Sequence, residues 1–281
     1  MGLLEGILLG IIQGLTEFLP ISSTAHLTIA GKWLGLIDPN RPESWTAFIA
    51  VIQLGTLIAV LVYFLRDVLE ITVSFVAENI VSRTRFQHQS LQAKLGWYVI
   101  LGSIPIAVIG LAFKKAIEGH LTKSLTLISI TLIVLAVFLA IAEVTGRFRK
   151  DLRKMSILDA VLIGFAQALA LIPGSSRSGT TITAGLFLGM TRESAARFSF
   201  LLSMPAVFAS GLLEFKESLH LMPSQDLMIL FAGTAAAAVS GYATIAFLLK
   251  FLKTHSTFVF VSYRIALGLF LIFFAKYFNL L

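Results

Sequence analysis

The chain has 281 residues, of which 57% are hydrophobic and only 13% are charged, and it contains no cysteine. Because an average soluble domain carries about 25% charged residues, most of this chain is expected to contact lipid or other apolar segments. The lack of cysteine excludes a disulfide framework, a thiolate metal site and a cysteine nucleophile. The formal net charge is +7, but the basic residues cluster between apolar runs, as in cytoplasmic loops of membrane proteins, which argues against nucleic acid as a partner.

The first apolar region, residues 3–35, is interrupted at its centre. The interrupting residues are Gln13, Glu17, Pro20, Ser22, Ser23, Thr24 and His26. The region is too long and too broken for one membrane span, and each half is too short to cross alone. A broken backbone at membrane depth is tolerated only where it is buried in protein or lines a wet cavity. We therefore expect a re-entrant helix–loop–helix pair that enters and leaves on the same side.

The remaining chain repeats this arrangement. Three predicted spans follow at 47–65, 95–113 and 124–143, each near the ~20 residues that cross the hydrocarbon core. Residues 157–189 form a second interrupted region, with Gln167, Pro173, Gly174, Ser175, Ser176, Arg177 and Ser178 at its centre. Three more spans are predicted at 198–215, 227–249 and 257–279. The sequence thus predicts an all-α polytopic membrane protein with six transmembrane helices and two re-entrant pairs.

The two interrupted regions resemble each other, since PISST at residues 20–24 aligns with PGSSR at residues 173–177. We interpret the chain as one membrane domain, 1–281, with repeats at 1–145 and 155–281. Because each repeat holds three spans, the second must be inverted relative to the first. Inverted repeats with discontinuous helices place a polar site near the membrane midplane. The loops that carry more Lys and Arg, such as 147–154, are predicted cytoplasmic, which puts both termini outside.

The first loop gathers groups that can bind a cation and transfer protons. Gln13 and Glu17 are four residues apart and share one helix face, and Pro20 ends that helix. Hydroxyl residues able to cap the next helix follow: Ser22, Ser23 and Thr24. His26 lies one turn into that helix. Ionisable groups inside a membrane are costly and indicate functional sites, and Glu17 can hold a divalent metal ion.

The second loop offers the complement for a phosphate group. Pro173 and Gly174 end a helix, and the hydroxyl residues around the next start are Ser175, Ser176 and Ser178. Backbone amides at a helix start bind anions, and Arg177 adds a forked, permanent cation suited to phosphate oxygens. With Ser23 or His26 to attack or to move protons, the two loops meet the needs of phosphoryl transfer, which are mostly positioning and charge neutralisation.

Structural roles remain alternatives for each of these residues. Glu17 and Arg177 could form an ion pair without chemistry, and His26 could be an interfacial histidine with a satisfied hydrogen bond. For Arg264, beside Tyr263, we favour a structural anchor near the cytoplasmic face. Gln53 and Gly55 could line the cavity, but we favour a packing role for them in their span.

Two stretches resemble the signatures of a known family. QGLTEFLPISSTAH at residues 13–26 and PGSSRSGTT at residues 173–181 are similar to the two motifs of the undecaprenyl pyrophosphate phosphatases, the BacA or UppP bacitracin-resistance family. The resemblance implies an enzyme of the bacterial plasma (inner) membrane, opening to the periplasmic side, that hydrolyses undecaprenyl diphosphate to undecaprenyl phosphate and inorganic phosphate with a divalent cation (Mg or Ca). This reaction supplies carrier lipid for peptidoglycan, and overproduction confers bacitracin resistance.

The resemblance also implies roles for individual residues. The implied catalytic residues are Glu17, Ser23, His26 and Arg177, with Glu17 and Gln13 as metal ligands. The implied substrate-binding residues are Ser22, Thr24, Gly174, Ser175, Ser176, Ser178 and Thr181. We prefer Ser23 as nucleophile with His26 as its proton partner, and direct attack by His26 is the alternative. Gln13 stands where many members carry a second glutamate, so the metal is placed mainly on Glu17.

Two rival functions remain open. A transporter or flippase of a polyprenyl phosphate lipid shares inverted repeats and broken helices. The other large class of membrane lipid phosphatases needs a histidine and an aspartate after its Ser-Arg pair, whereas Ser176-Arg177 is followed by SGTTIT. The expected partners are a polyprenyl diphosphate lipid and the bilayer. The sequence does not determine the oligomeric state, and a homodimer is one alternative.

Overall fold

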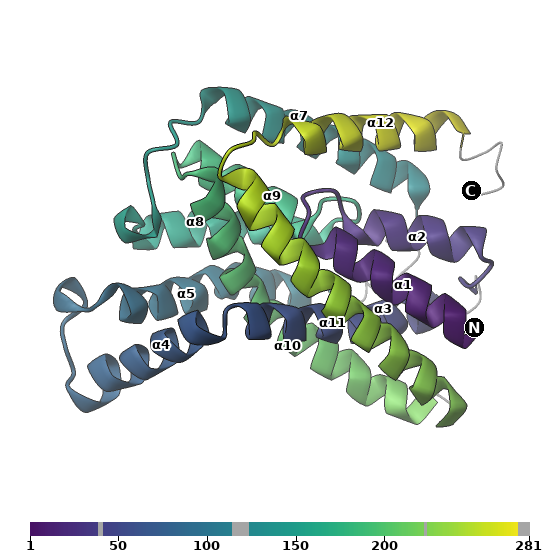
Figure 1. The fold of residues 1–281 in the computed structure, drawn as a ribbon, viewed down its shortest axis with the longest axis horizontal. Coiled ribbons are helices and arrows are strands. Elements are labelled where there is room, and N and C mark those ends of the chain that lie inside the picture. The colour runs from purple at the N-terminus through teal and green to yellow at the C-terminus, as the bar shows by residue number, and fades with distance from the viewer. Residues whose placement is uncertain (39–41, 114–123, 222–223, 275–281) are drawn as a thin grey trace.

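The computed structural model describes residues 1–38, 42–113, 124–221 and 224–274 (Figure 1). Within these residues the secondary structure is helical, apart from an isolated bridge between Lys150 and Met190. The α-helices are α1 (Leu3–Glu17), α2 (Ser23–Trp33), α3 (Pro42–Tyr63), α4 (Leu65–Val76), α5 (Leu91–Ala112), α7 (Leu125–Thr145), α8 (Ile157–Ala168), α9 (Arg177–Phe187), α10 (Arg192–Leu221), α11 (Ser224–Leu252) and α12 (Phe258–Phe274). The shorter helices are η1 (Ala77–Val81), η2 (Phe86–His88), η4 (Leu152–Lys154) and η5 (Leu169–Leu171).

Five helices of the described chain are long and apolar enough to cross a membrane. They cover Ser44–Tyr63, Leu91–Ala112, Leu125–Thr145, Arg192–Leu213 and Leu227–Leu252, which match five of the six predicted spans. The sixth, predicted at 257–279, corresponds to a shorter apolar helix over Phe258–Phe273, and residues 275–279 lie outside the described residues. An all-helical chain with several such segments is a multi-pass membrane protein, because a helix satisfies its own backbone hydrogen bonds in lipid.

Both interrupted regions break at the predicted places. α1 has 15 residues and is therefore about 22 Å long, which is less than the ~30 Å of the hydrocarbon core; α2, α8 and α9 are shorter still. The second helix of each pair starts from a serine in the left-handed region, Ser22 at φ 76° and Ser176 at φ 66°. Ser22 Oγ accepts from Ala25 N at 3.3 Å and Ser176 Oγ from Gly179 N at 3.1 Å. The two breaks thus share one capping geometry.

A helix that the sequence analysis did not assign continues from α3. α4 follows a kink at the buried Phe64 and lies beside α5 (Figure 1). Its charged residues end the apolar run, so hydropathy alone places the boundary at α3. Arg197 Nη2 of α10 pairs with Asp67 Oδ1 of α4 at 2.7 Å, while Leu65, Leu69 and Val73 are exposed along one side. α4 is therefore an amphipathic extension of the bundle.

Backbone-to-backbone contact joins each interrupted region to a long helix. A Cβ atom at Gly10 of α1 would lie 2.0 Å from Gly233 O of α11, and one at Gly164 of α8 would lie 2.4 Å from Gly102 O of α5. Membrane helices associate through such small residues because apolar side chains gain nothing over lipid. The short helices are therefore held by close packing against full-length neighbours.

This packing predicts a stability effect at Gly164. Gly164→Ala forces the α5 and α8 backbones apart, and overpacking of this kind costs about 1–3 kcal/mol. We expect a lower thermal unfolding midpoint for the detergent-purified variant. The matched control is Gly110→Ala, where a Cβ would meet only Leu171 side-chain atoms at 3.9 Å or more. Equal midpoints for the two variants would contradict the close contact.

Candidate active site

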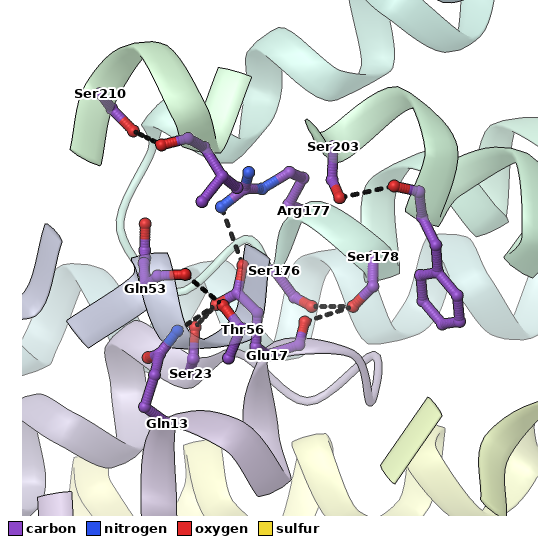
Figure 2. A network of polar contacts seen from close by, with 12 residues as sticks. Gln13, Glu17, Ser23, Gln53, Thr56, Ser176, Arg177, Ser178, Ser203 and Ser210 are labelled. Carbon is purple, nitrogen blue, oxygen red and sulfur yellow. Dashed lines mark hydrogen bonds and ion pairs between the residues drawn. The ribbon is translucent and has the colours of Figure 1, made fainter. Parts of the chain in front are cut away.

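The two helix breaks meet, and they bring Glu17 and Arg177 together (Figure 2). Arg177 Nη2 donates to Glu17 Oε1 at 2.8 Å, and Ser23 Oγ and Gln13 Nε2 donate to Glu17 Oε2 at 2.7 and 2.8 Å. Glu17 is 8% exposed, and the Arg177 side chain is 15% exposed. The predicted proximity of the carboxylate and the guanidinium, 160 residues apart in sequence, is therefore found in the structure.

A second contact joins the loops through Ser178. Ser178 Oγ lies 3.0 Å from Leu19 O, 3.3 Å from Glu17 O and 3.1 Å from Ser176 Oγ. These bonds position the start of α9 against the end of α1. Arg177, the first residue of α9, therefore faces Glu17 with a helix start behind it, where free backbone amides favour an anion.

Arg264 holds both breaks from within the protein. Its Nη1 donates to Pro20 O of the first loop at 3.2 Å, and its Nη2 donates to Gly174 O and Ser175 O of the second loop at 3.3 and 3.1 Å. Its Nε donates to Leu132 O of α7 at 3.2 Å. The residue is 1% exposed. The structural-anchor interpretation fits these contacts, but the anchor acts at the helix breaks, not at an end of the bundle.

Gly179 is what admits this guanidinium. A Cβ atom at Gly179 would lie 2.6 Å from Arg264 Nη1. The lack of a side chain at Gly179 therefore leaves space for the Arg264 guanidinium, and this glycine contributes to packing inside the protein.

His26 contacts α12, whereas Ser23 contacts Glu17. His26 Nδ1 lies 2.7 Å from Ser22 O and Nε2 lies 2.6 Å from the Tyr263 hydroxyl, with the two rings stacked at a centroid distance of 5.6 Å. A carbonyl oxygen can only accept, so in the neutral ring Nδ1 carries the proton and Nε2 accepts from Tyr263. The base nearest to Ser23 in this geometry is Glu17.

Several of the implied substrate-binding residues stabilise the loops themselves. Ser22 caps α2, Ser175 Oγ donates to Ile172 O at 2.6 Å, and Thr181 Oγ1 lies 2.7 Å from Arg177 O and 2.6 Å from Ser199 Oγ of α10. Thr24 is half-buried on α2. Ser176 and Ser178 lie at the meeting point with Arg177, while Gly174 has a positive φ of 87° and supplies a carbonyl to Arg264.

The sequence as a whole matches a known family. The family described as "Bacitracin resistance protein BacA" matches residues 6–270. The chain belongs to this family.

Similar proteins cover the chain almost completely. An "Undecaprenyl-diphosphatase" of Syntrophobacter fumaroxidans is 66% identical over 268 residues, 95% of each chain. One of Chloroherpeton thalassium is 53% identical over 97% of this chain and 96% of its own, and one of Myxococcus xanthus is 49% identical over 97% and 89%. The similarity to these relatives of the BacA family thus extends through both helix breaks.

Near the Glu17–Arg177 pair in this BacA-family protein lie polar residues of α3 and α10: Gln53, which the sequence analysis interpreted as a packing residue, and Thr56, Ser203 and Ser210, which it did not assign (Figure 2). Figure 2 shows Gln53 and Thr56 of α3 and Ser203 and Ser210 of α10 around the Glu17–Arg177 pair. Thr56 Oγ1 donates to Gln53 O at 2.7 Å. Residues three apart, and residues seven apart, share a helix face. Polar residues on one face of an otherwise apolar span are the signal that would have found them.

Gln13 Oε1 suits a cation ligand. This oxygen is buried and has no hydrogen-bond partner among the described residues, although Gln13 Nε2 is bonded to Glu17. Mg²⁺ and Ca²⁺ take oxygen ligands, and Mg²⁺ often uses one or two protein oxygens with substrate phosphates and water. The described residues contain no group of three or more His, Cys, Asp and Glu side chains for a metal. Glu17 accepts from Gln13 Nε2, so a cation held by both Glu17 and Gln13 Oε1 would require the Gln13 amide to turn, and the substrate would complete its coordination.

Removal of the Arg264 guanidinium should destabilise the protein strongly. Arg264→Met leaves buried carbonyls without donors, at about 1–3 kcal/mol each. We expect a large fall in the thermal midpoint in detergent. Arg264→Lys should recover little of it, because one ammonium cannot reach carbonyls on three segments. The control is Arg197→Met, which breaks an ion pair whose two side chains are 34% and 38% exposed. A fall no larger than that of the control would disprove the anchor.

Proposed function

We propose that this chain is an undecaprenyl-diphosphatase, which hydrolyses undecaprenyl diphosphate to undecaprenyl phosphate and inorganic phosphate and so recycles carrier lipid for peptidoglycan synthesis. The observation that carries the proposal is the buried contact of Glu17 with both Ser23 and Arg177. A nucleophile, a base and a phosphate-binding cation then share one polar site inside a membrane protein. Membership of the BacA family and the names of the similar proteins support it.

The topology proposed for this enzyme has six spans and two re-entrant pairs in inverted repeats, 1–145 and 155–281. The serine caps of α2 and α9 have the same geometry. The packing of α1 on α11 also parallels that of α8 on α5. The basic residues near 147–154 favour the cytoplasm for that end. Both termini then face outside, and the site opens to the outer side.

The chemistry proposed uses Ser23 and Glu17. Arg177 and the amides at the start of α9 hold the terminal phosphate. Ser23 Oγ attacks its phosphorus while Glu17 takes the hydroxyl proton, and the bond to the bridging oxygen breaks, releasing undecaprenyl phosphate. Water then attacks the phosphoserine, Glu17 returns its proton to Ser23 Oγ as the bond between that oxygen and phosphorus breaks, and inorganic phosphate leaves with both protons of the water. This assignment replaces His26 by Glu17 as the proton partner of Ser23, because the contact is with Glu17.

A divalent cation, Mg or Ca, fits this scheme on Glu17 and Gln13. When bound, it supplies positive charge that neutralises the diphosphate and its developing negative charge. Gln13 contributes an amide oxygen that has no hydrogen-bond partner among the described residues. The rest of the reaction depends on the residues of the two loops.

Phosphate release tests the proposal against the rival transporter or flippase. Detergent-purified protein should release inorganic phosphate from a polyprenyl diphosphate with no membrane gradient, and a chelator should stop the reaction. Arg177→Ala should lower kcat/KM by about 10²–10³ or more, because a preorganised charge is lost. Arg197→Ala is the control. Near-normal turnover by Arg177→Ala would reject the phosphate clamp, and no release by the wild type would favour the transporter.

Trapping of the phosphoenzyme identifies the nucleophile. Rapid quench in a denaturing detergent at neutral pH, with a labelled terminal phosphate and subsequent peptide mapping, should place the label on Ser23 as an ester that survives later exposure to acid. Label on His26, in an acid-labile adduct, would reject Ser23 as nucleophile.

A further inference from the structure

An apolar cavity lies beside the last turn of α8 and η5. α5 and α8 run in parallel, since Tyr98 Oη donates to Met155 O at 2.9 Å near both starts and Gly110 faces Leu171 near both ends. η5 ends at Leu171 and α5 at Ala112, so the two segments end close together. A cavity of about 690 Å³ lies between the end of α5 and η5. We call it the α5–α8 wedge.

The residues that line the wedge are all apolar. Ile109 and Phe113 lie on the α5 side, and Phe165, Leu169 and Ile172 lie on the opposite side. Phe113, Phe165, Leu169 and Ile172 are each exposed. Ligand pockets are typically about 300–1,000 Å³ and mostly apolar. In a membrane protein such a surface suits a hydrocarbon chain and offers nothing to a polar ligand.

One turn connects the wedge to the phosphate-binding loop. Ile172 O accepts from Ser175 N at 3.2 Å and from Ser175 Oγ at 2.6 Å. Ser175 O is in turn bonded to Arg264, and Arg177 follows two residues later. Hydrogen bonds therefore connect the wall of the wedge to the loop that precedes α9. A ligand with its phosphate at Arg177 can extend an apolar chain past Ile172.

The direction of α9 distinguishes the wedge from a second apolar groove. That groove, of about 400 Å³, lies between α3, α4, α5 and α10, near the start of α5. α9 runs from Arg177 toward Gly189. The carbonyl of Gly189 accepts hydrogen bonds from the backbone amides of Arg149 and Lys150, two residues that lie shortly before the start of α8. The N-terminus of α9 therefore points toward the end of α5, where the wedge lies.

We infer that the α5–α8 wedge binds the first isoprene units of the substrate tail, an inference that rests on the proposed function. The phosphates occupy the Arg177 site, and the tail leaves the protein laterally into lipid along Phe113 and Phe165. The wedge then makes KM depend on tail length without touching the reacting atoms.

Substitutions that fill the wedge test this assignment. Leu169→Trp and Ile172→Trp occupy its volume. With farnesyl diphosphate, which carries three isoprene units, we expect KM to rise about tenfold with kcat nearly unchanged, the signature of lost uniform binding. With dimethylallyl diphosphate, which has only one unit, kcat/KM should change less than about twofold. Leu61→Trp, in the second groove, is the matched control and should leave both substrates unaffected.

The outcomes separate failure of the wedge from failure of the proposed function. Equal losses with both substrates would show that the Trp side chains distort the phosphate loop and would overturn the inference. A selective effect of Leu61→Trp would place the tail in the second groove and overturn it as well. If wild-type protein releases no phosphate, the proposed function fails. Photocross-linking of a prenyl diphosphate with a diazirine at its second isoprene unit still tests the wedge: adducts are expected in 109–113 and 165–172, and adducts confined to α3 or α4 would overturn it.

Discussion

The fold depends on one buried cation that holds together two interrupted helix pairs. Arg264 donates hydrogen bonds to carbonyls of both loops and of α7. Each loop exposes backbone groups that neither helix can satisfy, and a membrane interior offers little water in exchange. The guanidinium satisfies these carbonyls and fixes the two loops relative to each other. The contact between Glu17 and Arg177 forms between the two loops that Arg264 holds together.

The anchored loops also keep a strained backbone. Ser22 and Ser176 have positive φ, which non-glycine residues rarely adopt, and such strain costs of order 1–3 kcal/mol per residue. Each serine uses its hydroxyl to cap the following helix, so the strain turns the helix starts toward the shared site. There Ser178 and the Glu17–Arg177 pair close the contact between the loops. A charged pair with little exposure needs this degree of positioning, because its desolvation is costly.

The sequence predicts the helix breaks, because polar residues and prolines inside apolar runs are strong local signals. The meeting of Glu17 with Arg177 follows from the inverted-repeat interpretation, which places both loops near the membrane midplane. It does not predict which base Ser23 contacts. Ser23 and His26 share a helix face by spacing, but the Ser22 conformation and Tyr263, 237 residues away, direct the imidazole to α12. The same limit applies to Arg264, whose partners lie on three distant segments. The sequence does not predict α4, because its charged residues end the apolar run that begins in α3.

The central claim is that Glu17 and Arg177 interact across the two loops, and a double-mutant cycle measures this directly. The free energy of unfolding in detergent would be compared for the wild type, Glu17→Gln, Arg177→Met and the double variant. Each single variant strands a buried charge, so the double variant should be less destabilised than the sum of the two by more than about 1 kcal/mol. Strictly additive effects would show that the two side chains do not interact, and the proposed site would then not exist.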